Sequence, residues 1–168
     1  KGTPVVEVGC FANQKITHVF WEGGCQLRRV YGSGSNTSAF SRCSALEYFE
    51  FPETLLQISD YGFNGTAFKT LKFNNGLKKI GNAAFQGMTG TVTSFQFPGS
   101  LNHIGNKAFT YFDHKISEII FGGPGDPTQI NFVPSDAFEQ NSPLGFNSII
   151  YYSTVTPNDA LEVLLGNI

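Results

Sequence analysis

Apolar residues return in a fixed order along this chain, and the order defines a repeating unit. Each unit contains a Phe, mostly preceded by a small residue, and then an apolar triplet spaced φ-x-x-φ-x-φ, where φ is apolar. The repeated Phe residues are Phe11, Phe40, Phe63, Phe85, Phe109 and Phe138. The triplets are Ile16/Val19/Trp21, Leu46/Phe49/Phe51, Phe68/Leu71/Phe73, Val92/Phe95/Phe97, Ile116/Ile119/Phe121 and Phe146/Ile149/Tyr151. The period of about 22–30 residues is in the range of leucine-rich-type solenoids.

Each triplet predicts a short strand, because alternate positions are apolar and rich in β-branched and aromatic residues. One unit cannot bury its apolar face alone, so stacked units are expected to pair their strands about 4.8 Å apart in a parallel sheet. The repeated Phe then enters the same core from the opposite wall. The pattern predicts six strands, ending near Trp21, Phe51, Phe73, Phe97, Phe121 and Tyr151.

A second apolar pair precedes most of these Phe residues. The regular unit reads L-x-x-I-G-N-x-A-F at residues 77–85 and again at residues 101–109. The residue three before the Phe is of a type that begins helices, which predicts a short helical turn through each Ala-Phe on the convex side. Gly81 and Gly105 are expected to relieve a tight bend before that turn. The residues of the helix-starting type are Asp60, Asn82, Asn106 and Ser135.

These residues resemble the leucine-rich repeats of the BspA-like surface protein family, over roughly residues 5–151. The shared pattern is L-x-x-I-G-x-x-A-F-x-x-C followed by L-x-x-I-x-[IF]-P; Cys43 carries its Cys, while Met88 and Phe112 fill that slot elsewhere. The resemblance implies a right-handed α/β-type leucine-rich repeat solenoid. It also implies an extracellular or cell-surface location and adhesion to host or neighbouring-cell proteins. No signal peptide is recognised, which we expect for a mature or excised segment.

The repeat stops after Tyr151. Thr156 suits the start of a helix, Pro157 its first position and Gly166 its end, which predicts a capping helix over residues 156–168. We therefore expect one domain, with the solenoid over residues 1–155 and the cap over residues 156–168. A membrane-active or partner-binding helix is the alternative interpretation of this segment.

Composition narrows the function classes. The net charge is −2 with 14% charged residues, which argues against nucleic-acid binding. No run of 18 apolar residues occurs, so no membrane insertion is expected. The odd number of Cys residues gives no full disulfide framework, and their spacing matches no zinc motif. Cys10 and Cys43 are predicted to be buried thiols, because they occupy small-residue positions of the repeat.

The x positions of the triplets should face the concave surface and form the candidate partner-binding site. The first column is His18, Tyr48, Thr70, Ser94, Glu118 and Ser148, and the second is Phe20, Glu50, Lys72, Gln96, Ile120 and Ile150. An aromatic group at the N-terminal end and an isoleucine pair at the C-terminal end are candidate recognition patches. Covering by neighbouring loops or repeats is the alternative. Glu50 and Lys72 are predicted to form a solvated cross-strand pair.

Catalysis has little support in the sequence. His18, His103 and His114 fall in different units, the carboxylates are scattered, and no Asp-rich calcium loop is present. We expect no cofactor and no metal. The favoured hypothesis is a non-catalytic surface module that binds a protein or glycan partner on host or neighbouring cells. A structural spacer within a larger protein and an intracellular scaffold are the alternatives.

Overall fold

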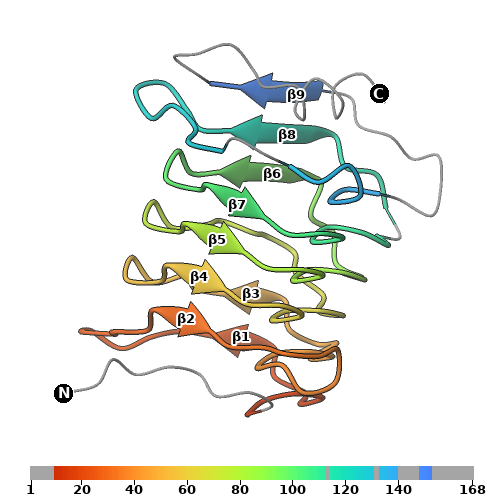
Figure 1. Ribbon diagram of the computed structural model, residues 1–168. Coiled ribbons are helices and arrows are strands. Elements are labelled where there is room, and N and C mark those ends of the chain that lie inside the picture. The colour runs from red at the N-terminus through yellow and green to blue at the C-terminus, as the bar shows by residue number, and fades with distance from the viewer. Residues whose placement is uncertain (1–9, 113, 131–132, 140–147, 153–168) are drawn as a thin grey trace.

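The triplet segments stack in parallel along one side of a solenoid, as predicted. The computed structural model describes residues 10–112, 114–130, 133–139 and 148–152 (Figure 1). The strands on this side are β1 (His18–Val19), β3 (Tyr48–Phe49), β6 (Ser94–Phe97), β8 (Glu118–Phe121) and β9 (Ser148–Tyr151). They form two parallel sheets, β1-β3 and β6-β8-β9, instead of the single six-stranded sheet that the sequence predicts.

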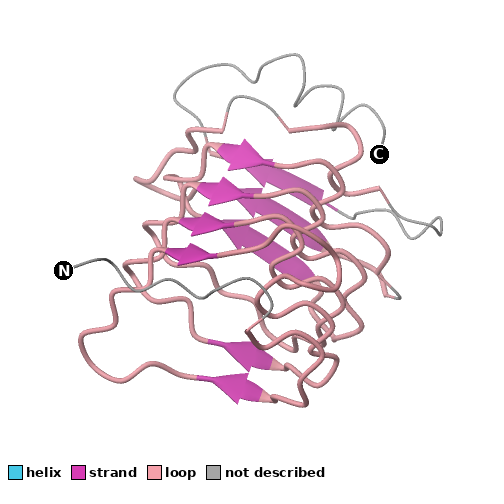
Figure 2. Cartoon of the chain, turned by 60° about the horizontal axis from the view of Figure 1, so that its bottom comes forward, coloured by secondary structure: helices cyan, strands magenta, loops and turns pink. Residues whose placement is uncertain are grey.

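The other wall of the solenoid is a further parallel sheet, called here the second sheet, which the sequence analysis did not predict. It forms from the apolar pairs that precede the repeated Phe residues. Its strands are β2 (Arg29–Val30), β4 (Gln57–Ile58), β5 (Lys79–Ile80) and β7 (His103–Ile104), in the order β2-β4-β5-β7. The second residue of each strand is fully buried. The core therefore lies between two sheet walls, joined by loops that close each coil (Figures 1 and 2).

The repeated Phe residues form one continuous stack through this core. From Phe11 to Phe138, successive ring centroids lie 5.1–5.4 Å apart at interplanar angles of 9–14°. Phe85 is fully buried, whereas Phe11 at the N-terminal end is 40% exposed. Phe97 and Phe73 meet the stack edge-on, which is a favourable geometry for aromatic rings. The predicted aromatic core is confirmed.

The predicted helical turns are wrong, because no helix occurs in the described part of the chain (Figure 2). Tyr61, Ala83 and Lys107 each have a left-handed φ, of 58°, 51° and 55°. A left-handed residue cannot continue a right-handed helix and costs roughly 1–2 kcal/mol. The turn instead directs backbone N–H groups to the next unit: the Ala83 amide donates to the Asn106 carbonyl at 2.9 Å.

The polar residues expected to start helices connect neighbouring units instead. The Asn82 amide donates to Asp60 Oδ1 at 2.8 Å, and the Asn106 amide donates to Asn82 Oδ1 at 2.9 Å. A Cβ at Gly81 or Gly105 would clash with Asp60 or Asn82 of the preceding unit. These glycines are therefore required by the close approach of two units, and neither has a left-handed φ.

The third triplet, residues 68–73, forms no strand, contrary to prediction. It begins in register, because the Lys69 amide donates to the Glu47 carbonyl at 3.0 Å, but no backbone hydrogen bond follows over residues 70–73. In two other units a hydroxyl directly before the Leu fastens the chain: Thr54 Oγ1 donates to the Leu27 carbonyl and Ser100 Oγ donates to the Leu77 carbonyl, both at 2.8 Å. Gly76 stands at that position here, and Asn74 supplies the bond by donating to the Leu55 carbonyl at 2.9 Å. The fastening residue therefore lies two positions earlier in this unit.

One further prediction concerns the C-terminal end of the solenoid. The capping helix over residues 156–168 lies outside the described residues.

Cys43 is buried, and its thiol donates to the Phe11 carbonyl at 2.9 Å, but Cys10 is exposed, which corrects the prediction that both are buried. Cys10 adjoins Phe11, where the aromatic stack ends. Burial raises the pKa of the Cys43 thiol, which disfavours its reactive thiolate.

Replacing Phe85 by Ala should reduce the free energy of unfolding by about 3–5 kcal/mol, because it removes a fully buried ring from the middle of the stack. Urea denaturation monitored by circular dichroism measures this loss. Phe11→Ala is the matched control and should cost less than half as much, because its ring ends the stack and is 40% exposed. Equal losses for the two variants would show that the stack is not the core.

Iodoacetamide should modify Cys10 quickly and Cys43 slowly in the native protein, because Cys43 is buried and its pKa is raised. Peptide mass spectrometry after timed quenching gives the two rates separately. In denaturant, the two rates should converge. Equal rates in the native protein would contradict the placement of Cys43.

Candidate functional site

The outer residues of β1-β3 and β6-β8-β9 form the predicted face, called here the recognition face. The structure places predicted site residues directly opposite one another across the strands. These register partners are His18 with Tyr48, Ser94 with Glu118 and Ser148, and Gln96 with Ile120 and Ile150. Thr70 and Lys72 are exposed but lie in the unpaired third segment, so the columns are interrupted there.

His18, Phe20 and Tyr48 form an aromatic cluster at the N-terminal end of this face, as the sequence predicts. The Phe20 ring lies 5.2 Å from Tyr48 and 5.9 Å from His18, measured between centroids. Phe20 is 66% exposed, a large value for a side chain without a polar atom. The three rings form a contiguous apolar surface open to a partner.

The backbone beneath this cluster is fixed by Trp21 and Glu50. The Trp21 indole Nε1–H donates to the Glu50 carbonyl at 2.6 Å, and the Trp21 amide donates to Glu50 Oε2 at 3.2 Å. The Glu50 carboxylate therefore accepts a hydrogen bond from the backbone that follows β1. The predicted Glu50–Lys72 pair does not form, although both residues are described.

A shallow depression of about 260 Å³ adjoins the aromatic cluster, bordered also by Glu47, Lys69 and Thr70. Lys69 Nζ lies 2.7 Å from Glu47 Oε2, and the lysine is 60% exposed. An ion pair this exposed contributes little to stability, under about 1 kcal/mol. Its charges remain available to a ligand lying across the aromatic rings.

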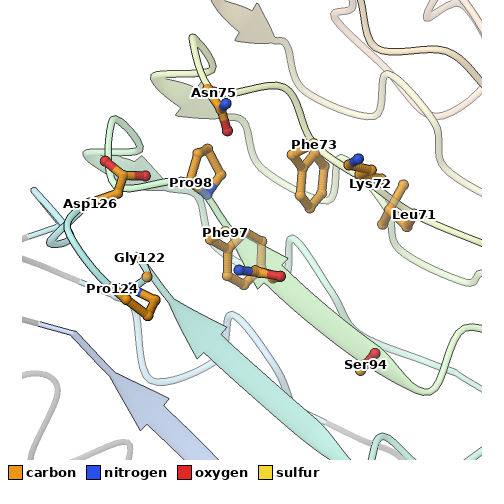
Figure 3. Close-up of a pocket in the computed structure, with 12 residues that line it drawn as sticks. Leu71, Lys72, Phe73, Asn75, Ser94, Phe97, Pro98, Gly122, Pro124 and Asp126 are labelled. Atoms are coloured by element: carbon orange, nitrogen blue, oxygen red, sulfur yellow. The ribbon is translucent and has the colours of Figure 1, made fainter.

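A larger cleft, which no direct signal in the sequence predicts, opens between the third segment and β6. It has a volume of about 660 Å³. One side is formed by residues 71–75 and the other by β6 with Pro98 (Figure 3). The loop over residues 122–126 closes one end, and Asp126 Oδ2 holds it by accepting from the Gly99 amide at 2.8 Å. Lys72 and Gln96 are the predicted site residues with long polar side chains that line this cleft.

The C-terminal end of the recognition face carries the predicted isoleucine pair. Ile120 and Ile150 are register partners on β8 and β9, and Ile150 is 36% exposed. Beside them, Ser148 Oγ donates to Glu118 Oε1 at 3.4 Å. The patch is smaller and less exposed than the aromatic cluster, so the N-terminal end offers the stronger apolar contact.

The three His residues lie apart from one another in the structure. His18 lies in the aromatic cluster, His103 lies on β7 of the other sheet, and His114 Nε2 is hydrogen-bonded to the Val92 carbonyl. Within the described residues, no group of three His, Cys, Asp or Glu side chains could hold a metal ion. The same residues include no helix long and apolar enough to cross a membrane.

Comparison with known proteins identifies one family. The BspA type leucine rich repeat region matches residues 34–157 in six copies. This match covers most of the chain, including the central units of the aromatic stack. No curated protein and no solved structure shows significant similarity to the chain.

Proposed function

Because the chain belongs to the BspA-type leucine-rich repeat family, we propose that it is a non-catalytic recognition module that binds a protein or glycan partner. Repeat solenoids of this kind generally act by presenting a surface. The binding surface is the recognition face, and its anchor is the aromatic cluster. The observation that carries the proposal is the 66% exposure of Phe20 beside His18 and Tyr48.

The cluster is suited to binding because its rings already contact one another. Phe20 packs against both His18 and Tyr48, with centroid distances of 5.9 and 5.2 Å, and these two lie 6.2 Å from each other. Binding then immobilises little additional side-chain freedom, and aromatic anchors are common among residues that dominate interface energies. The Glu47–Lys69 ion pair at its border supplies polar contacts.

We place this module outside the cell or on its surface, and its partner on host or neighbouring cells, as the family membership suggests. The recognition face is open and shallow around the aromatic cluster, so one module is expected to bind weakly. Several modules in one chain or assembly would raise the overall affinity by increasing the effective concentration of binding sites.

A spacer function is the second candidate, and the middle of the recognition face favours it. Thr70, Ser94 and Gln96 are exposed and polar, with no aromatic residue among them. A face that only extended a longer repeat protein would need no more than this. The exposed aromatic cluster is what distinguishes a binding module from a spacer.

The test is a binding assay of tetramerised protein on arrays of glycans and extracellular matrix proteins. For the ligand found, Phe20→Ala should weaken binding by about tenfold or more, because a central aromatic anchor is lost. Tyr111→Ala is the control: it also removes a partly exposed ring, 38% exposed, but lies outside the recognition face. Unchanged binding by Phe20→Ala would show that the aromatic cluster is not the binding site. If the tetramer binds no ligand on either array, the spacer function is favoured.

A further inference from the structure

The outer face of the second sheet carries a stripe of basic residues, contributed by three of its four strands. Across β2, β4, β5 and β7, the outward residues Arg29, Gln57, Lys79 and His103 are register partners. Arg28 and Lys78 precede two of these strands and are also exposed. We propose that this stripe binds a linear anionic polysaccharide, with sulfate or carboxylate groups along its chain. The site is separate from the recognition face and does not depend on the function proposed for it.

The stripe is positively charged although the whole protein has a negative net charge. The chain has a net charge of −2 and 11 Lys and Arg residues, four of which lie in this small area. The outer strand positions and the residues before them include no carboxylate: the four pairs are Arg28-Arg29, Leu56-Gln57, Lys78-Lys79 and Asn102-His103. Such a local excess attracts an anionic partner even when the net charge is negative.

These cations are not neutralised within the described residues. None of the four forms an ion pair there, and the nearby Asp60 carboxylate accepts hydrogen bonds from Asn82. The Arg29 guanidinium lies 5.8 Å from the centroid of the Tyr31 ring, which orients it without satisfying its charge. The cationic groups are therefore free to bind external anions.

His103, the fourth residue of the column, does not carry a permanent charge. Partial desolvation and the charge of Lys79 lower the pKa of His103, against the opposing effect of Asp60. His103 is therefore neutral at neutral pH, where it can still donate one hydrogen bond. The fixed positive charge comes from Arg28, Arg29, Lys78 and Lys79.

The geometry of the sheet selects a linear ligand. Each strand is two residues long, while the strands repeat about every 4.8 Å, so the stripe is narrow and runs for roughly 14 Å along the solenoid axis. A polymer with repeated anionic groups can place charges on β2 and β5, two strand spacings apart, with the uncharged Gln57 between them. Arg and Lys groups are hydrogen-bond donors only, which matches sulfate and carboxylate acceptors.

The same face fits other polyanions less well. A peptide partner would need apolar anchors, and the aliphatic side chain among these outward positions, Leu56, is half-buried. Single-stranded nucleic acid is held by rows of aromatic rings as well as charge, and Tyr31 is the ring beside the stripe. An anionic polysaccharide needs charge and hydrogen bonding along a line, which is what the stripe supplies.

The test compares two charge-matched double variants for binding to immobilised heparin. Arg29→Gln/Lys79→Gln removes two cations from the stripe, whereas Lys15→Gln/Lys115→Gln removes two exposed cations that lie before β1 and β8. Wild type should bind heparin but not uncharged dextran, and less tightly as salt is raised. The stripe variant should bind about tenfold more weakly or worse, because two charge-assisted contacts are lost. The affinity of the control variant should stay within about twofold of wild type, well short of the loss of about tenfold expected for the stripe variant.

Lys78→Gln/Lys79→Gln gives a second reading on a single unit if the first stripe variant does not fold, as judged by its circular dichroism melt. Equal weakening in stripe and control variants would show a net-charge effect and overturn the site. Absence of heparin binding by wild type would overturn it as well. Tighter binding to DNA than to heparin at the same salt would assign the stripe to nucleic acid instead.

Discussion

The aromatic stack sets the geometry of the whole solenoid. Its rings are 5.1–5.4 Å apart, close to the spacing of about 4.8 Å between paired strands. One ring per unit can therefore stack on the next only while the units remain in register. Because the two sheet walls lie on either side of the same column, the stack aligns both sheets at once. Insertions such as residues 31–38 leave it intact, since Phe40 still lies 5.3 Å from Phe63.

This constraint leaves the outer residues free to differ between the two walls. On the recognition face, the outward positions are aromatic at one end, polar in the middle and aliphatic at the other. On the second sheet, the corresponding positions are largely basic. A uniform core thus supports two chemically distinct surfaces, because each unit contributes one buried set and two exposed sets of side chains.

The parts of the fold that follow from periodic burial were predictable, and those that depend on contacts between units were not. The Phe stack, the parallel pairing and the proximity of His18 to Tyr48 all follow from repeated spacing. Asn82 resembles a helix cap in its own unit, yet its side chain accepts from the Asn106 amide of the next. The second sheet was missed because strands of two residues give no alternation to detect, although the repeated Leu-x-x-Ile pairs marked its place. The cleft beside Lys72 adjoins the third segment, whose lack of backbone pairing over residues 70–73 appears only when units are stacked.

The central claim is that the aromatic stack and the second sheet hold the third unit in place, although its segment on the recognition face is unpaired. Hydrogen exchange of the native protein tests this claim most directly. The amides of Leu71, Lys72 and Phe73 make no backbone hydrogen bond, whereas the Gly81 and Phe85 amides each donate at 2.8 Å to neighbouring units. Exchange followed by residue-resolved NMR should show fast exchange over residues 71–73 and strong protection at Gly81 and Phe85. Equal protection over residues 71–73 and at Gly81 and Phe85 would mean that the strand ladder is continuous, and would contradict the open cleft.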